Sequence, residues 1–362
     1  MTAFSGSYDP ADVTFLLKPV DVPDTPVAEK ERLIQSGRRH YSEMITRERR
    51  PSAAYLRVFR LGLDREKARL ARDLIALAGL IAARRPGPVT IVSLARAGTP
   101  VGVLLTRTLR EFFARPAEHY SVSIIRDRGI DEVALQYVLA RHDASSVVFV
   151  DGWTGKGVIA AELDRAVRMF NAANGVDLDP GLFAVADLSG TAAASATTDD
   201  YLIPSCVLGA TVSGLVSRSI LNADVVGPGD FHGCLYYREF EPDDLSRPFV
   251  DELSREIARQ WEPGLLTTAP EPDRRALRQR SADFVADVQA RFDVRDVNYV
   301  KPGIGEATRV LLRRVPDRLL VRSTTDPGVA HLLVLAGEKD VPVETDPNLP
   351  YRAAALIRGM DQ

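Results

Sequence analysis

Cysteine is scarce in this chain, which has only Cys206 and Cys234 among its 362 residues. Two cysteines exclude a disulfide framework and favour a reducing compartment. Long hydrophobic runs are also missing, because no apolar stretch is long enough to span a membrane and no charged start followed by an apolar run marks a signal peptide. We therefore expect a cytoplasmic protein with no membrane partner.

A strong excess of charge of one sign is absent too, since the formal net charge is −3. This excludes a general nucleic-acid-binding composition, although a local basic patch stays open. At this length we expect two domains, and Pro-rich sequence near residues 262–275 marks the break between them. We place a first domain with an N-terminal arm at residues 1–265, a linker at 266–280 and a second domain at 281–362. Assembly into a homo-oligomer is left open.

Strands and helices alternate after a long helix, for which Asp64 is the expected N-cap. Strands are expected at residues 89–94, 120–125, 147–150 and 183–185, and helices at 100–113, 131–141 and 158–172. Near-continuous apolar strands between helices predict an α/β fold, with a parallel sheet covered on both faces. Ligands bind such sheets at the carboxyl ends of the strands, where this chain has loops at residues 95–100 and 151–157.

The most informative stretch is residues 146–158, an apolar strand that runs into a glycine-rich loop and then a helix. Gly155 and Gly157 let the backbone approach an anion, Thr154 offers a hydroxyl, and the helix N-terminus adds unpaired N–H groups. Asp151 at the strand tip could hold sugar hydroxyls or a metal ion. The spacing excludes a Walker A loop and a dinucleotide fingerprint. The pattern favours a nucleotide-like or sugar-phosphate ligand, and an ordinary strand-turn-helix junction is the alternative.

The two loops together resemble the pyrophosphate loop and the phosphoribosyl pyrophosphate (PRPP) signature of type I phosphoribosyltransferases. The resemblance implies that Asp151 contacts the ribose hydroxyls, that residues 154–157 cradle the 5′-phosphate, and that a Mg²⁺ ion bridges the diphosphate and the ribose. It implies Asp151, Arg96 and Lys156 as catalytic residues, and it implies Asp151 as the metal ligand as well. The implied phosphate-binding residues are Ala97, Gly98, Thr99, Gly152, Trp153, Thr154, Gly155 and Gly157. The chain departs from the family at Gly152, where a second acid is usual, and its loop is shorter.

The expected chemistry requires positive groups beside the leaving group. Displacing pyrophosphate from a ribose carbon develops positive charge on the sugar and negative charge on the leaving group, so backbone N–H groups, cationic side chains and a metal ion would stabilise it. Further candidates for a lid or a second site are Arg126, Arg128, Ser213, Arg218, Asp230 and His232. Capping, turn formation or a solvated rim is the alternative role for each of them.

Several short segments carry a narrower resemblance. They are residues 6–10, 12–18, 40–43, 204–206, 211–218 and 230–233. They resemble the phosphoribosyltransferase-like proteins of tellurite-resistance and stress-response gene clusters, a family also labelled StiP. The cysteine-protease label of that family implies Cys206 as nucleophile, with His232 or His40 as base. A helix expected at residues 207–221 would lower the pKa of the thiol. A small buried thiol is the alternative for Cys206, and Cys234 is expected in the core.

The segment from Gly303 to Arg309 resembles the signature of the Pelota-type RNA-binding family, and the order of elements after it matches the family's small α/β sandwich. The resemblance implies structured RNA as partner, with Gly305 in place of the usual Asn. The implied RNA contacts are Gly303, Gly305, Glu306, Thr308 and Arg309. Lys301, Arg313 and Arg314 would add a modest basic face for phosphate contacts. A helix cap with solvated arginines is the alternative.

These observations give a leading hypothesis and two alternatives. The leading hypothesis is a phosphoribosyltransferase-like enzyme, hence a glycosyltransferase, which uses PRPP or a related sugar phosphate with Mg²⁺ and an unknown base-like or RNA-linked acceptor. The first alternative is a non-catalytic nucleotide- and RNA-binding stress-response protein. The second is a cysteine peptidase that uses Cys206.

Overall fold

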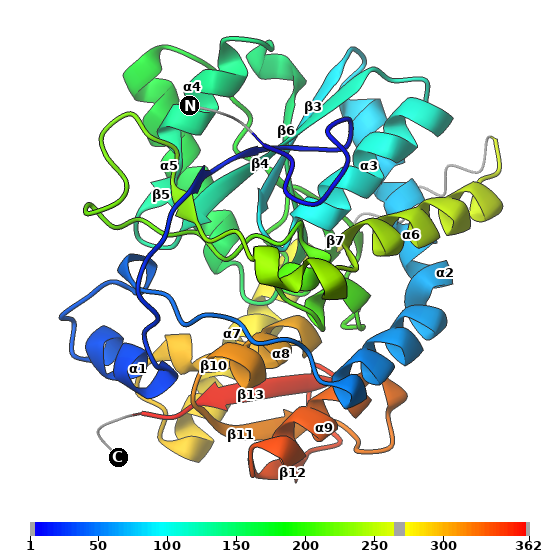
Figure 1. The fold of residues 1–362 in the computed structure, drawn as a ribbon. Coiled ribbons are helices and arrows are strands. Elements are labelled where there is room, and N and C mark those ends of the chain that lie inside the picture. The colour runs from blue at the N-terminus through cyan, green and yellow to red at the C-terminus, as the bar shows by residue number, and fades with distance from the viewer. Residues whose placement is uncertain (1–3, 264–271, 360–362) are drawn as a thin grey trace.

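The computed structural model describes residues 4–263 and 272–359, which form two α/β units (Figure 1). The larger unit is built on a seven-stranded sheet with the order β1-β4-β3-β6-β7-β8, and β5 pairs with β4. Its strands are β1 (Thr14–Leu16), β3 (Val89–Ala95), β4 (Ala117–Ile125), β5 (Gly129–Ile130), β6 (Val147–Thr154), β7 (Leu182–Asp187) and β8 (Ala194–Thr197). All pairs are parallel except β4 with β5.

Helices cover both faces of this sheet, because successive strand residues point to opposite sides and both sides are apolar. Val148 and Val150 of β6 share a core with α2 and α3, while Val147 and Phe149 share another with α4 and α5. The helices of this unit are α2 (Ala53–Arg84), α3 (Thr99–Phe112), α4 (Glu132–Leu139), α5 (Val158–Asn174) and α6 (Ser246–Gln260). Helix α1 (Val27–Gln35) lies beside the smaller unit instead, where Glu31 pairs with Arg314 (Figure 1). The expected parallel α/β sheet is therefore confirmed.

Helix α2 starts earlier than expected and connects the two units (Figure 1). Ser52 caps it by accepting a hydrogen bond from the Tyr55 N–H at 3.2 Å, so Asp64 lies inside the helix and its expected role as N-cap was wrong. The first turns pack on the smaller unit, and Leu70 and Leu74 in the second half are buried over the large sheet. The helix thus holds the smaller unit at the edge of the sheet.

The smaller unit has a four-stranded sheet with the order β10-β13-β11-β12. Its elements are α7 (Arg274–Phe292), β10 (Val300–Pro302), α8 (Ile304–Arg313), β11 (Pro316–Val321), α9 (Ala330–Glu338), β12 (Val343–Thr345) and β13 (Ala353–Ile357). Helices α8 and α9 face the larger unit and belong to one hydrophobic core with α2. Of the expected linker 266–280, residues 274–280 form the first turns of α7, and 266–271 lie outside the described residues.

The segment between β8 and α6 is irregular, and the helix expected at residues 207–221 was wrong. Short 3-10 turns at Pro204–Cys206 and Ala210–Val212 replace it. Gly214 and Leu215 have left-handed backbone angles, with φ of 76° and 61°, which an α-helix does not accommodate. Strand β9 (Gly233–Cys234) pairs with β2 (Lys18–Pro19) of the N-terminal arm. Among the helices described, none combines the length and the apolar character needed to cross a membrane.

Candidate functional site

Two adjoining cavities lie between the carboxyl edge of the large sheet and helix α8. The first, called the loop cavity here, has a volume of about 410 Å³ and is lined by residues 153–160 and by residues of the smaller unit. The second, called the arginine cavity, has a volume of about 190 Å³. Both are lined by Tyr41, Asp151, Trp153, Ile159 and Arg309. The site is therefore at the sheet edge expected from the sequence, but both units build it.

Asp151 stands where the two cavities meet, near the end of β6. Its side chain is buried, and Oδ1 accepts a hydrogen bond from the Gly152 N–H at 2.7 Å. Burial raises the pKa of Asp151 to about 6, against the opposing effect of the Arg309 charge. Above that pH the residue is a buried carboxylate with acceptor capacity for sugar hydroxyls or a metal ion.

The loop that follows Asp151 presents its backbone to the loop cavity. Gly157 has φ of 80° and is the N-cap residue of α5, which no side chain caps. Residues 155–160 all line the cavity, so the first N–H groups of α5 and the positive end of its dipole lie at its wall. This part of the expected phosphate cradle matches the geometry that an anion requires.

Two side chains of the loop are engaged elsewhere. The Thr154 hydroxyl donates to Oδ1 of Asp187 at 2.5 Å, although Thr154 also lines the loop cavity. Lys156 donates from Nζ to the carbonyl oxygens of Val297 and Val300, at 2.5 and 3.1 Å, and so ties the loop to the smaller unit. Burial and the nearby charge of Lys301 lower the pKa of Lys156 to about 8.

The loop after β3 forms another wall of the arginine cavity through Arg96 and Ala97. The Arg96 guanidinium is buried, pairs with Glu48, and donates to the Val216 carbonyl oxygen at 2.6 Å. Gly98 lies so close to the sheet that a Cβ atom there would stand 2.8 Å from the Val150 carbonyl oxygen. The Thr99 hydroxyl is fully buried against Ser121. The loop is thus a packed junction in which Arg96 is fixed by internal partners.

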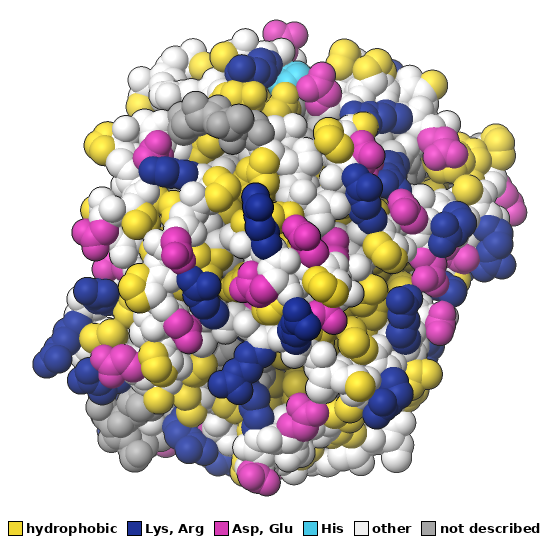
Figure 2. Space-filling model, viewed as in Figure 1, with side chains coloured by type: hydrophobic (Ala, Val, Ile, Leu, Met, Phe, Trp, Pro, Cys, Tyr) yellow, Lys and Arg dark blue, Asp and Glu magenta, His cyan; other side chains and the backbone are white. Residues whose placement is uncertain are grey.

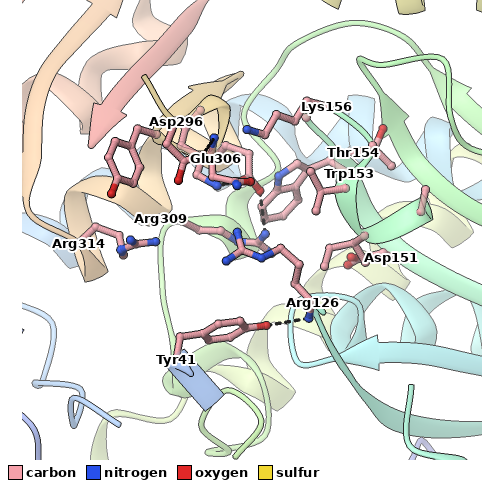
Figure 3. A pocket seen from close by; sticks show the side chains of 18 of the residues that line it. Tyr41, Arg126, Asp151, Trp153, Thr154, Lys156, Asp296, Glu306, Arg309 and Arg314 are labelled. Carbon is pink, nitrogen blue, oxygen red and sulfur yellow. Dashed lines mark hydrogen bonds and ion pairs between the residues drawn. The ribbon is translucent and has the colours of Figure 1, made fainter. Parts of the chain in front are cut away.

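Four arginines from three segments converge on the arginine cavity, namely Arg96, Arg218, and Arg309 and Arg313 of α8. Arg309 also lies over the ring of Trp153, with its guanidinium carbon 4.5 Å from the ring centroid. Figure 3 shows Arg309 and Arg126 pointing into the space between Asp151 and Tyr41. Arg313, which was expected in a modest basic face for phosphate contacts, lines the arginine cavity one helical turn after Arg309.

The other candidates for a lid or a second site divide into two groups. Arg126 lines the loop cavity, where its backbone N–H donates to the Tyr41 hydroxyl at 2.8 Å, and Ser213 lines the arginine cavity. The remaining three line neither cavity and have local partners: Arg128 pairs with Glu43, Asp230 with Lys18, and His232 with the Ser123 hydroxyl. Sequence reasoning did not assign Tyr41 to the site, although it lies in the resembling segment 40–43.

Cys206 is buried at the contact between the units, with Sγ 3.9 Å from the Thr308 hydroxyl. Burial raises the pKa of the thiol to about 12, and no helix follows to lower it. The expected bases are engaged elsewhere, His232 with Ser123 and His40 with Ser42. Cys234 is in the core, as expected.

The Thr308 hydroxyl separates the Cys206 thiol from the imidazole of His331. Thr308 bonds to Nε2 of His331 at 2.8 Å, and burial lowers the pKa of that ring to about 3. No thiolate–imidazolium pair therefore involves Cys206 among the residues that the structure describes.

The glycine-rich start of α8 is covered by the larger unit. Gly305 packs on Trp153 so tightly that a Cβ atom there would stand 2.3 Å from the ring. Gly303 and Thr308 are buried as well. Of the five residues implied as RNA contacts, Glu306 and Arg309 are the two that line the loop cavity (Figure 3). On the face seen in Figure 2, acidic and basic side chains are interspersed without a patch of one sign.

Comparisons with known proteins match two regions of the chain. The family described as tellurite-like stress resistance cysteine protease StiP matches residues 6–254, and the PELOTA RNA binding domain matches residues 279–359. The chain is 40% identical to the cysteine protease StiP of Acinetobacter baylyi over 365 residues, covering 98% of this chain and 94% of that protein.

Solved structures that resemble parts of the chain are phosphoribosyltransferases. The xanthine-guanine-hypoxanthine phosphoribosyltransferase of Helicobacter pylori matches with a TM-score of 0.27 at 13% identity, over 34% of this chain and 78% of that one. The hypoxanthine phosphoribosyltransferase of Trypanosoma cruzi matches with a TM-score of 0.29 at 14% identity, over 37% and 82%. From the match over residues 6–254 and the full-length identity, the chain belongs to the StiP family and carries a Pelota RNA-binding domain after the family region.

Proposed function

We propose that this protein is a phosphoribosyltransferase-like enzyme that binds PRPP or a related sugar phosphate between its two units. The observation that carries the proposal is the position of Asp151, which lies between an uncapped helix N-terminus and a cluster of arginines. Asp151 would face the ribose of such a substrate. The start of α5 and the arginine cluster would face its two phosphate-bearing ends. An anion at the start of α5 replaces the missing cap, and the arginines attract the rest of the negative charge.

The proposed reaction transfers the ribosyl phosphate to an acceptor. The bond between ribose C1 and the diphosphate oxygen breaks, a bond between C1 and the acceptor atom forms, and the acceptor loses its proton. The carboxylate of Asp151 holds the ribose hydroxyls and stabilises the positive charge that develops on the sugar. Arg126 and Arg309 line the loop cavity beside it. The acceptor is a base-like molecule or a group carried by RNA.

A Mg²⁺ ion fits the residues present if it arrives with the substrate. Mg²⁺ commonly uses one or two protein carboxylates together with the phosphate oxygens of the substrate. Asp151 supplies one carboxylate, and within the described residues no group of three or more metal-binding side chains gathers. When bound, the ion would neutralise charge on the leaving diphosphate.

Isothermal titration of the full chain with PRPP and MgCl₂ tests the proposal. We expect Asp151→Asn to weaken binding about 10- to 100-fold, because a hydrogen bond to a charged acceptor is lost. Asp164→Asn is the matched control, since that carboxylate is exposed, pairs with Arg168 and lines neither cavity. Equal binding by Asp151→Asn, or none by the unaltered chain, would overturn the proposal. Release of pyrophosphate with base-like acceptors identifies an enzyme, whereas binding without turnover favours the nucleotide-binding alternative.

A cysteine peptidase is the second candidate, favoured by the name of the relative and by Cys206 at the wall of the arginine cavity. The raised pKa of the thiol opposes it. We expect the folded protein to react with iodoacetamide far more slowly than free cysteine, and Cys206→Ala to leave PRPP binding unchanged. Peptide cleavage that disappears in Cys206→Ala would replace the first proposal with this one.

RNA remains a proposed partner through the Pelota domain. RNA can contact all the implied residues in segment 303–309 only if α8 separates from the larger unit, because Gly305 is packed on Trp153. We expect Asp200→Ala, which removes a tie between the units, to increase salt-sensitive retention on structured RNA. The unaltered chain is the control. Equal, strong retention of both would place the RNA surface elsewhere.

A further inference from the structure

Two of the four arginines in the arginine cavity are neutralised within the protein. Arg96 is ion-paired with Glu48, whose carboxylate also accepts a hydrogen bond from a backbone N–H. Arg309 is ion-paired with Glu306 at 2.8 Å. The charges of these arginines therefore have nearby carboxylates to balance them.

The other two arginines have no such partner. Arg218 donates to the backbone carbonyl oxygens of Met44 and Ser219, and across residues 4–263 and 272–359 it forms no ion pair. Arg313 forms neither an ion pair nor a side-chain hydrogen bond within the same ranges. The two guanidinium groups repel each other, and burial lowers the pKa of each to about 10. The Glu48 carboxylate also acts on Arg313, but it is already ion-paired with Arg96, so this partly buried cluster carries more positive than negative charge until a ligand supplies an anion.

A third polar group in the same cavity also lacks a partner. The Ser219 hydroxyl is buried, lines the arginine cavity, and has no hydrogen-bond partner among the residues that the structure describes. Native proteins satisfy nearly all buried polar atoms, so an orphaned hydroxyl beside two unpaired guanidinium groups indicates a missing acceptor. An oxyanion would accept from all three groups.

We propose that Arg218, Arg313 and the Ser219 hydroxyl form a second anion subsite, which binds the diphosphate end of the ligand whose 5′-phosphate sits at the start of α5. The proposal rests on the proposed function. Asp151 lies at the boundary of the two cavities, where the ribose that joins the two ends would stand. Arginine suits this role because its planar guanidinium binds phosphate oxygens in a bidentate manner.

This assignment gives helix α8 a role in the substrate site itself. Arg309 and Arg313 lie one turn apart on α8 and both reach the arginine cavity, so the Pelota domain completes a small-molecule site that the larger unit begins. Binding of the diphosphate would hold the two units together, because Arg218 comes from one and Arg313 from the other. Ligand binding and RNA contact along α8 would then exclude each other.

Titrations of the full chain with ribose 5-phosphate, inorganic pyrophosphate and PRPP, each with MgCl₂, test the subsite. We expect Arg313→Gln and Arg218→Gln each to weaken binding of pyrophosphate and PRPP at least about tenfold, and binding of ribose 5-phosphate less than about threefold. Both variants should fold, because each removes a partly buried charge that forms no ion pair within the described residues, and a thermal melt checks this. Arg128→Gln is the control, since Arg128 is 48% exposed and lines neither cavity.

The outcomes separate this inference from the proposed function. If the unaltered chain binds all three ligands and Arg313→Gln binds PRPP equally well, or loses ribose 5-phosphate to the same extent, the subsite is overturned and the proposed function survives. If the chain binds pyrophosphate but neither sugar phosphate, and the two arginine variants lose pyrophosphate, the subsite stands and the proposed function fails. Absence of pyrophosphate binding in the unaltered chain overturns the subsite.

Discussion

Two glycine-rich loops in this protein join a strand to a helix, and they are used in opposite ways. The loop at residues 151–157 leads into α5, whose N-terminus has no side-chain cap and lines a cavity. The loop at Gly303 leads into α8, where the carboxylate of Asp200 accepts from the Ile304 N–H at 2.9 Å. One helix start is thus available to a ligand, and the other is capped by the neighbouring unit.

The contrast shows what a glycine-rich helix start does and does not specify. Its first N–H groups need acceptors, and a negative group is favoured there by the helix dipole. The acceptor can be a phosphate or a carboxylate of the same chain. At α8 Asp200 also accepts from the Arg352 N–H at 2.8 Å, so this one residue joins two segments of the smaller unit to the larger.

Removing the internal cap gives the largest expected effect on stability. Asp200→Ala would leave the Ile304 and Arg352 N–H groups without an acceptor in a buried contact, which costs about 4 kcal/mol for two orphaned donors. Urea denaturation measures the loss. Asp199→Ala is the matched control, because the Asp199 side chain is 70% exposed and pairs only with Arg69, and its cost should be below about 1 kcal/mol. Equal stability of the two variants would contradict the capping role.

Replacing Asp151, in the loop at residues 151–157, by a neutral residue should stabilise the protein rather than destabilise it. Burial raises the pKa of Asp151 from 3.8 to about 6, so its contribution to stability is full below about pH 4 and is lost as the pH rises through 6. At pH 8 the ionised form costs up to about 3 kcal/mol. We expect Asp151→Asn to stabilise the protein at pH 8 by up to this amount while weakening ligand binding, and the gain to shrink towards pH 4. Denaturant unfolding at both pH values checks it, and lower stability of Asp151→Asn at pH 8 would contradict it.

Much of the larger unit followed from periodicity in the sequence. The apolar runs at residues 89–94 and 147–150 predicted parallel strands, and the loops after them lie at one edge of the sheet. Local patterns suffice there because a strand buried on both faces must be apolar throughout. The irregular segment 207–221 was misread as a helix, since small polar residues at helical spacing do not reveal left-handed angles at Gly214 and Leu215.

The candidate site was harder to predict because it lies between units. The position of Asp151 followed from the strand that carries it, but the partner of Thr154 is Asp187, which belongs to the next strand. No local pattern indicated that Arg313 would lie beside Arg218, far away in the sequence. The resemblance implied Gly303 and Gly305 as RNA contacts, whereas their packing depends on side chains of the other unit.

Glycine substitutions sharpen the comparison between the loops. Gly305→Ala would place a methyl group 2.3 Å from the Trp153 ring, which must shift, so we expect a loss of about 2 kcal/mol. Gly152→Ala in the open loop meets only the Ala97 carbonyl oxygen, at 4.0 Å, and should change stability by less than about 0.5 kcal/mol. Thermal melts of the pair compare them directly. A larger loss in Gly152→Ala than in Gly305→Ala would reverse our assignment of open and covered loops.

The smallest expected effect on stability concerns Thr308, in the segment 303–309 that the larger unit covers. Thr308 donates to the Ile304 carbonyl oxygen and also bonds to Nε2 of His331, whose Nδ1 is buried and finds no partner within residues 4–263 and 272–359. Thr308→Val would leave both ring nitrogens unsatisfied. Thr106→Val is the matched control, because Thr106 is equally buried and bonds only to the carbonyl oxygen one turn before it. We expect Thr308→Val to cost about 1 kcal/mol more than the control in urea denaturation, with PRPP binding unchanged. If Thr308→Val instead bound PRPP more weakly and kept its stability, the Thr308 hydroxyl would reach the ligand. The loop at Gly303 would then be as open as the loop at residues 151–157.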